Sequence, residues 1–354
     1  MDTMTSWQVQ DFGKPLVQAI REVPAPAGTQ VVLRVDACGA CHSDLHMRDG
    51  FFDLGHGHKL DLSRTVRPPR TLGHEIAGTV VACGPQAAGP AVGERRVVYP
   101  WIGCGSCRLC AAGQEHLCAA PQALGVARDG GFATHVVVPH PRYLLDFGGL
   151  PAEQACTLAC AGVTAYSALK KVGRLAADDA LLLVGAGGVG LSGVRLAQRL
   201  CGVQSIVAEP DRAKWELARA AGAAEVVDPR EEGALKALLK ATGGGVAAAV
   251  DFVGSGSSFD FAIGAVRKAG RVVSVGLMGG ATGIVPAMLS LKALSLVGSY
   301  VGSLEELGEL LALAREGALP PMPVQTRGLA AASEVLDLLA AGQVRGRTVL
   351  VPGA

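Results

Sequence analysis

The stretch LLLVGAGGVG, residues 181–190, decides the fold class of this chain. Its first four residues predict a buried strand that runs into the pattern G-x-G-x-x-G and then into a helix expected over 189–200. A second predicted strand, 204–208, ends at the acidic Glu209. Glycines let the backbone approach a pyrophosphate at a helix N-terminus, and an acid at this position accepts hydrogen bonds from ribose hydroxyls. This order of strand, glycines, helix, second strand and terminal acid therefore predicts a dinucleotide site that favours NAD over NADP. Arg212 nearby could nevertheless accommodate a 2′-phosphate.

The regular alternation of strands and helices continues outward from this stretch. Further strands are predicted at 225–227, 246–252 and 271–275, with helices at 212–221, 231–241 and 257–268. Such alternation is typical of a parallel sheet wound on both faces. Up to about residue 160 this regular alternation is absent. Short β-like runs are separated there by Gly and Pro, at 31–35, 78–83, 97–99 and 134–139. After residue 300, helices at 304–316 and 330–341 precede a last strand at 347–351.

Length and charge narrow the functional class. The chain has 354 residues, which suggests roughly two domains of about 150 residues each. It carries 32 Lys+Arg against 31 Asp+Glu, so we expect no nucleic-acid partner, because no excess of cations exists to displace counterions. Mean hydropathy is +0.34, yet no run reaches the roughly 18 apolar residues of a membrane span. The first ten residues show no apolar signal region, so we expect a cytoplasmic protein without a membrane partner.

Four cysteines form a compact motif in the first half of the chain. Cys104, Cys107, Cys110 and Cys118 follow C-x2-C-x2-C-x7-C within fifteen residues. Four thiolates at such spacing suit a closed tetrahedral zinc site that orders the lobe 103–119. An iron–sulfur cluster and a metal-free lobe are the alternatives, and the x7 gap without a following Pro weakens the cluster reading.

Three further segments carry metal-ligand residue types. They are CGACHSDLH at 38–46, GHE at 73–75 and CTLACAG at 156–162. Taken singly each is weak, because a lone Cys in an apolar run usually packs. Cys38 and Cys41 could also form a redox pair.

Read together, these motifs make the sequence resemble the zinc-dependent alcohol dehydrogenases of the medium-chain dehydrogenase/reductase superfamily. The resemblance covers essentially the whole chain and is greatest to bacterial and archaeal NAD-dependent, typically tetrameric members. It implies an α/β protein with a GroES-like β-rich catalytic domain (1–161 and 301–354) and a Rossmann domain (162–300) with a doubly wound parallel sheet. It further implies NAD, two Zn2+ per chain and a homotetramer, with a dimer as the alternative.

The implied reaction is reversible hydride transfer between a primary or secondary alcohol and NAD+, giving an aldehyde or ketone. The same chemistry on a more specialised substrate, such as an alicyclic hydroxyacyl-CoA or a sugar alcohol, or physiological aldehyde reduction, is the alternative. Zinc-free quinone reductases and cofactor-binding lens proteins of the superfamily lack the ligand set quoted above.

The resemblance also assigns roles to individual residues. Cys41, His74 and Cys160 would bind the catalytic zinc, which leaves Cys38 and Cys156 as packing residues. Glu75 matches a carboxylate that can approach the metal, Asp44 matches one that orients the ligand histidine, and Ser43 and His46 match a proton relay. The implied cofactor contacts are His42, Thr164, Gly185, Gly187, Gly188, Val189, Gly190, Glu209, Lys214, Phe252, Val275, Ser299 and Arg347. Phe52 and Trp101 match substrate-pocket positions.

One segment departs from the shortest members of the family. The chain between His46 and Gly73 is longer and contains GHGHK at 55–59. His56 and His58 could bind another metal, but we expect 47–72 to be an exposed, glycine-rich loop that contacts the substrate.

Overall fold

The computed structural model describes residues 2–353, which divide into two compact units. The first unit contains the residues up to Phe51, Asp61–Val163 and the chain from Gly302 onward. The second contains Phe52–Leu60 and Thr164–Val301. Within residues 2–353, no helix combines the length and the apolar character that crossing a membrane requires.

The second unit is built on a six-stranded sheet of order β13-β12-β11-β14-β15-β16, in which every pairing is parallel. Its strands are β11 (Leu181–Val184), β12 (Ser205–Ala208), β13 (Glu225–Val227), β14 (Val246–Asp251), β15 (Val266–Ser274) and β16 (Ser295–Gly298). Leu181, Leu182 and Leu183 are fully buried, as a central strand covered on both faces requires. The predicted doubly wound sheet is confirmed.

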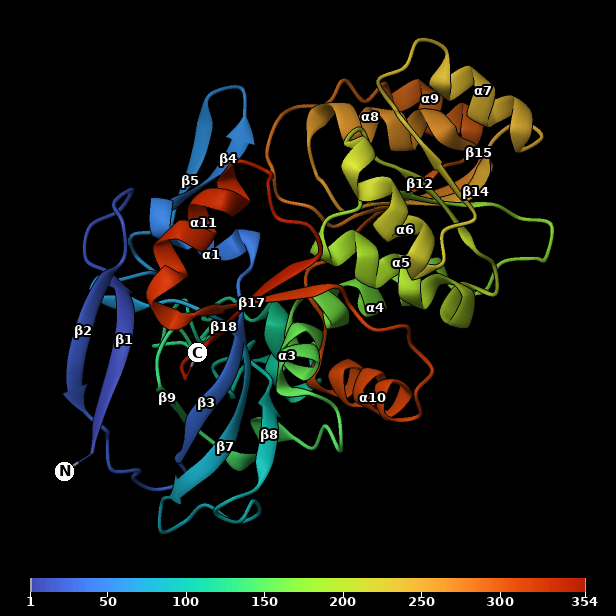
Figure 1. Ribbon diagram of the computed structural model, residues 1–354. Helices are drawn as coiled ribbons and strands as arrows, with labels where there is room; N and C mark the ends of the chain where they lie inside the picture. The colour runs from blue at the N-terminus through green and yellow to red at the C-terminus, as the bar shows by residue number, and fades with distance from the viewer. Residues whose placement is uncertain (1, 354) are drawn as a thin grey trace. The chain divides into compact units, whose positions relative to one another are not determined.

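Helices cover both faces of this sheet. They are α4 (Ala161–Val172), α5 (Gly188–Cys201), α6 (Trp215–Ala221), α7 (Ala234–Ala241), α8 (Gly256–Ala265) and α9 (Pro286–Lys292). Figure 1 shows α5 and α6 on one side of the strands and α7, α8 and α9 on the other. The helix predicted over 257–268 ends earlier, at Ala265, because the fully buried Val266 already pairs with Val246 and begins β15.

The first unit contains a seven-stranded sheet. Its main path is β10-β8-β7-β3-β18-β17, and β9 pairs with β3. The strands are β3 (Val31–Gly39), β7 (Glu75–Cys83), β8 (Arg95–Val98), β9 (His135–Val138), β10 (Leu144–Leu145), β17 (Val324–Gly328) and β18 (Arg347–Val351). In the antiparallel β3–β7 pair, Gly39 lies opposite Glu75. This register brings the segment that begins at Cys38 next to the one that contains His74.

Smaller elements complete the first unit. A three-stranded sheet joins β2 (Val17–Glu22), β1 (Thr3–Val9) and β6 (Arg70–Thr71) in that order. The helices are α1 (His42–Asp49), α2 (Arg108–Ala111), α3 (Ala152–Ala155), α10 (Leu304–Arg315) and α11 (Ala332–Ala340).

The segment 47–72, expected to be an exposed, glycine-rich loop, contains a β-hairpin. Strands β4 (Phe51–Gly55) and β5 (His58–Asp61) pair with each other, and both are visible in Figure 1. The two residues between them, His56 and Gly57, have φ values of 53° and 79°. Two successive positive φ values are typical of the tight turns that match the twist of a hairpin. The expectation of a loop is therefore wrong for β4 and β5, whereas the expected exposure is confirmed for all four residues of β5.

Candidate active site

Cys41, His74 and Cys160 converge in the first unit although they are distant in the sequence. Cys41 precedes α1, His74 precedes β7 and Cys160 follows the 3-10 turn Cys156–Ala159. Their ligand atoms all lie within 4.8 Å of one another, and all three residues are buried. The two Sγ atoms are 3.9 Å apart. Two thiolates at about 2.3 Å from a tetrahedral zinc would lie about 3.8 Å apart, so the group fits this metal.

Asp44 fixes the orientation of His74. Its Oδ1 lies 3.1 Å from Nδ1 of His74 and accepts a hydrogen bond from the backbone N–H of Gly73 at 3.1 Å. Its Oδ2 accepts from the backbone N–H of Cys41 at 2.9 Å. The other ring nitrogen of His74, Nε2, is buried and makes no hydrogen bond. A buried nitrogen without a partner is costly in a protein and is the atom that a metal would bind.

The charges at this centre are strongly coupled. Burial opposes protonation of His74, but the Asp44 carboxylate prevails and raises the pKa of His74 well above its usual range. The hydrogen bond from Cys160 lowers the pKa of Cys41 well below that of a free thiol, and the same bond raises the pKa of Cys160. Even without a bound cation, Cys41 therefore favours the thiolate form and Cys160 favours the protonated thiol.

Glu75 lies beside this group and is fully buried. Burial raises its pKa to about 7, against the opposing effect of Arg347. The Arg347 guanidinium donates to Oε2 of Glu75, and the Ala161 backbone N–H donates to Oε1 at 3.3 Å. A Cβ on Gly39 would lie 2.0 Å from Oε2 of Glu75, so only glycine leaves room for this carboxylate. Arg347, expected as a cofactor contact, is 4 % exposed and pairs with Glu75.

The residues expected to move a proton lie on α1. Ser43 and His46 are three positions apart and are both half-buried, a spacing that puts them on one face of the helix. The rings of His42 and His46 meet edge to face, with centroids 5.2 Å apart. Burial lowers the pKa of His46 from the ordinary histidine value, and the neighbouring His42 lowers it further.

Trp101 packs beside the same centre. Its ring centroid lies 5.1 Å from that of His74, and its indole N–H donates to the carbonyl of Ala159 at 3.1 Å. Cys38 and Cys156 are fully buried but lie outside the ligand group. Burial raises the pKa of both thiols well above the usual range, as expected of inert packing cysteines.

A second group of possible ligands lies in the lobe around α2. The sulfur atoms of Cys104, Cys107, Cys110 and Cys118 all lie within 4.8 Å of one another. Three of the sulfur–sulfur distances are 3.9 Å, 3.5 Å and 3.8 Å. These values match the edges of a tetrahedral thiolate site.

The glycine-rich stretch forms the turn between β11 and α5 in the second unit. Gly185 has a φ of 93°, and Gly187 is the N-cap of α5. A Cβ on Gly190 would lie 1.9 Å from the carbonyl oxygen of Gly185. The first turn of α5, which includes Gly188 and Val189, therefore presents bare backbone N–H groups at its N-terminus, an arrangement that suits a pyrophosphate.

Glu209 closes this turn from the end of β12. It is 4 % exposed, and its carboxylate accepts hydrogen bonds from the backbone N–H of Ala186 at 2.7 Å and of Asp211 at 2.9 Å. The sequence does not reveal this structural role, because it depends on the parallel pairing of β11 with β12. Arg212 pairs with Glu231 at 2.7 Å and is largely exposed. Lys214, also expected at the cofactor, is 3.9 Å from Asp211.

The remaining expected cofactor residues lie at the carboxyl ends of the strands. Phe252 follows β14, Val275 follows β15 and Ser299 follows β16. Thr164 and Phe52 belong to the same unit, and Thr164 is 7 % exposed. His42 and Arg347 belong to the first unit.

Asp251, at the end of β14, holds the loop beside the expected cofactor residue Phe252, and the sequence analysis does not identify it. It accepts hydrogen bonds from the backbone N–H groups of Val253 and Gly254 and from the Ser258 hydroxyl. It thereby shapes the loop that follows Phe252. The signal that could identify Asp251 is an acidic residue at the end of a buried strand, the same signal that identifies Glu209.

Two known protein families match successive parts of the chain. The family described as "Alcohol dehydrogenase GroES-like domain" matches residues 27–147, and "Zinc-binding dehydrogenase" matches residues 188–316. An NAD-dependent alcohol dehydrogenase of Saccharolobus solfataricus is 36 % identical over 99 % of this chain and 100 % of its own length. One from Sulfurisphaera tokodaii is 34 % identical over the same shares. The crystal structure of the alcohol dehydrogenase from Aeropyrum pernix superposes with a TM-score of 0.88 at 31 % identity, covering 98 % of this chain and 100 % of that one.

Proposed function

Because the chain belongs to the zinc-dependent alcohol dehydrogenases of the medium-chain dehydrogenase/reductase family, we propose that Cys41, His74 and Cys160 hold its catalytic zinc. As a member of that family, the protein is an oxidoreductase that transfers hydride between an alcohol and NAD. The observation that carries the assignment is the buried ligand group, with Sγ atoms 3.9 Å apart and a histidine nitrogen that lacks a partner.

When bound, zinc supplies the Lewis acidity that acidifies an alcohol hydroxyl at neutral pH, and NAD+ supplies the hydride acceptor. Asp44 keeps the proton of His74 on Nδ1, so that Nε2 is left for the metal. Ser43 can accept the substrate proton and pass on its own, since a hydroxyl both donates and accepts. His46 stays neutral at pH 7 because burial lowers its pKa, and it can carry that proton onward.

Glu75 and Arg347 stabilise the buried charge around this centre. Their mutual contact leaves a carboxylate next to the metal ligands without an unpaired negative charge. Trp101 provides an apolar wall against His74 and thereby excludes water from one side of it. Phe52 remains the second predicted substrate-pocket residue.

A second zinc is proposed for Cys104, Cys107, Cys110 and Cys118. Four thiolates fill a tetrahedral coordination sphere and leave no open position for a substrate. This zinc would therefore hold the lobe 103–119 together and take no part in the chemistry. The proposal gives two zinc ions per chain.

The NAD is proposed to lie on the glycine turn, with its adenosine ribose at Glu209. That carboxylate is buried and already accepts two backbone hydrogen bonds, so it is fixed in place to accept more from ribose hydroxyls. A 2′-phosphate there would meet a negative charge. Arg212, which could offset that charge, is paired with Glu231.

We also propose a homotetramer, with a dimer as the alternative. β16 is an edge strand of the six-stranded sheet, and on the preceding helix α9 the side chain of Leu291 is 68 % exposed. Val285, just before α9, is 56 % exposed. An unpaired sheet edge beside exposed apolar side chains is a candidate subunit interface. A cytoplasmic location stays a prediction.

A matched pair of variants tests the catalytic assignment. Cys41→Ser removes a proposed ligand, whereas Cys38→Ala alters a buried cysteine three positions away that lies outside the ligand group. We expect Cys41→Ser to lose alcohol turnover and one zinc per chain while NADH still binds, and Cys38→Ala to keep both. Equal turnover in Cys41→Ser and the wild type would contradict the assignment.

A further inference from the structure

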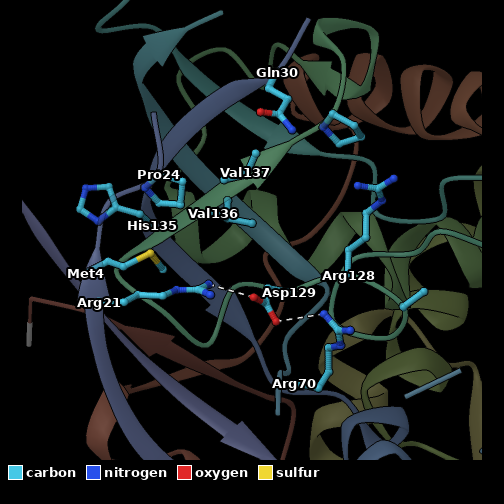
Figure 2. A pocket seen from close by; sticks show the side chains of 12 residues that line it. Met4, Arg21, Pro24, Gln30, Arg70, Arg128, Asp129, His135, Val136 and Val137 are labelled. Carbon is cyan, nitrogen blue, oxygen red and sulfur yellow. Dashed lines mark hydrogen bonds and ion pairs between the residues drawn. The ribbon is translucent and has the colours of Figure 1, made fainter. Parts of the chain in front are cut away.

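A pocket lies in the first unit, and none of its lining residues belongs to the site described above. Its volume is about 340 Å3. Strands β1, β2 and β9, together with Arg70 of β6 and the loop that contains Arg128 and Asp129, supply its walls. Figure 2 shows Arg21 and Arg70 directed at Asp129, with Arg128 extending away from it and Val136 and Val137 of β9 nearby.

The lining of this pocket carries an excess of positive charge. Arg21, Arg70 and Arg128 line it, and the lining acid is Asp129. Burial lowers the pKa of His135, as does nearby Arg34, whereas Asp2 opposes this shift. His135 therefore adds no charge at neutral pH, and the formal charge of the lining is positive by two.

Asp129 is fully engaged within the pocket. Its Oδ2 accepts from Arg21 at 2.9 Å, and its Oδ1 accepts from Arg70 at 3.1 Å and from the backbone N–H of Thr71 at 3.1 Å. Dashed lines in Figure 2 mark the two arginine contacts. Asp129 therefore contacts two of the three arginines but offsets only one of their three positive charges.

One arginine of the lining, Arg128, is exposed and retains unused donors. The Nε of Arg70 also makes no hydrogen bond, but it is closed to solvent. The guanidinium of Arg128 makes no hydrogen bond or ion pair within the described chain, and Figure 2 draws none to it. A planar guanidinium fork matches the oxygen atoms of a phosphate or a carboxylate, so these donors suit an oxyanion.

We propose that this pocket binds a small organic anion, whose phosphate or carboxylate group the arginines hold. A volume of about 340 Å3 is at the lower end of small-molecule sites and exceeds what a bare oxyanion fills. Met4, Pro24 and Val136 provide an apolar wall for the rest of the molecule. This binding function is separate from alcohol oxidation and does not depend on the assignment of the zinc ligands.

Calorimetric titration of the zinc-loaded protein tests the proposal directly. Saturating NADH occupies the dinucleotide site throughout, and ionic strength is constant. The probes are inorganic phosphate, phenyl phosphate and benzoate. We expect saturable binding of at least one ring-bearing probe, and phenyl phosphate to bind more tightly than phosphate, because its ring contacts the apolar wall. The comparison between phenyl phosphate and benzoate distinguishes a phosphate site from a carboxylate site. No saturable binding of any probe would overturn the proposal.

Two variants with opposite expected effects on anion affinity test whether the probe binds in this pocket. Arg128→Gln should weaken it by about fivefold or more, as loss of a charged donor does. Asp129→Asn should tighten it, because it removes the acid that competes for Arg21 and Arg70. Arg327→Gln, at an exposed position of β17 outside the pocket, is the matched control and should leave binding unchanged. Equal binding by Arg128→Gln and the wild type, or equal weakening by Arg327→Gln, would overturn the proposal.

A neighbouring cavity needs its own control. Arg128 also lines that cavity, together with Arg142, whereas Arg21 does not. Arg21→Gln should therefore weaken binding if the anion occupies the proposed pocket. If Arg128→Gln weakens binding and Arg21→Gln does not, the proposed site is wrong. Should Asp129→Asn fail to fold by circular dichroism, the two arginine variants still decide the question.

Discussion

Asp44 and His74 form a fully buried pair, with Oδ1 of the carboxylate 3.1 Å from Nδ1 of the imidazole. The same carboxylate accepts hydrogen bonds from the backbone of Cys41 and of Gly73. One side chain therefore fixes the ring of one proposed zinc ligand and the backbone position of another. In this arrangement the metal affinity depends on a residue that does not itself bind the metal.

Replacement of this carboxylate should weaken zinc binding. Asp44→Asn keeps the shape but removes the charge that orients His74, and we expect about a 10- to 100-fold loss of affinity at the catalytic site. Zinc affinity measured by competition with a chromogenic chelator gives the answer. Asp49→Asn, at the other end of α1 and paired with Arg48, is the matched control. Unchanged zinc affinity in Asp44→Asn would contradict the positioning role.

The zinc proposed for the four-cysteine lobe should be removable without loss of the catalytic zinc. Cys107→Ala should reduce the zinc content from two to one per chain and lower the thermal stability, because the metal supplies folding free energy to the lobe. NADH binding should survive, since the glycine turn lies in the other unit. Cys83→Ala changes a half-buried cysteine outside both ligand groups and should keep two zinc ions. Metal analysis that finds no loss in Cys107→Ala would refute the structural site.

Glu209 should control the choice between NAD and NADP. Glu209→Ala removes the negative charge at the proposed ribose site, so the ratio of kcat/KM for NADP to that for NAD should rise. Stability should fall by about 1–3 kcal/mol, because the backbone N–H groups of Ala186 and Asp211 lose their acceptor. Initial rates with both cofactors and a thermal unfolding curve measure the two effects. A wild-type preference for NADP would show that this interpretation is wrong.

The pH dependence of alcohol oxidation should depend on His46. Its pKa is lowered by burial, so the ring becomes protonated at a lower pH than an ordinary histidine does. Because a protonated ring cannot accept the substrate proton, kcat/KM for oxidation should fall as the pH drops through that lowered pKa. His46→Gln should reduce the rate and remove this limb of the profile. His58→Gln, on the exposed strand β5, should leave the profile unchanged.

The sequence predicted the second unit more completely than the first. From Leu181 to Asp251 the strands are short and mostly apolar, so local pattern and final structure agree. The exception is β15, which is nine residues long and begins at Val266, before the strand predicted from residue 271. The β4–β5 hairpin was missed because all four residues of β5 are exposed, and no alternation of polar and apolar residues marks the strand. Its turn signal was a histidine followed by glycine, which is weaker than the usual Asn-Gly pair.

The candidate site, too, could be predicted from the sequence only in part. Metal-ligand residue types could be found from their spacing in the chain. The contacts of Asp44 with Gly73 and His74, and that between Glu75 and Arg347, could not, because they join residues far apart in sequence. The roles of Glu209 were predicted only in part, since its hydrogen bond to Ala186 requires β11 and β12 to lie side by side.

Removal and return of zinc tests the central claim most directly. NADH formation from a panel of aliphatic, benzylic, secondary and alicyclic alcohols would be measured with native protein, after metal removal, and after zinc is restored. We expect the rate with every accepted alcohol to fall by about a hundredfold or more and to recover with zinc, because the alcohol hydroxyl is not acidic enough without a Lewis acid. An undiminished rate in protein shown to be free of metal would contradict zinc-dependent catalysis at Cys41, His74 and Cys160.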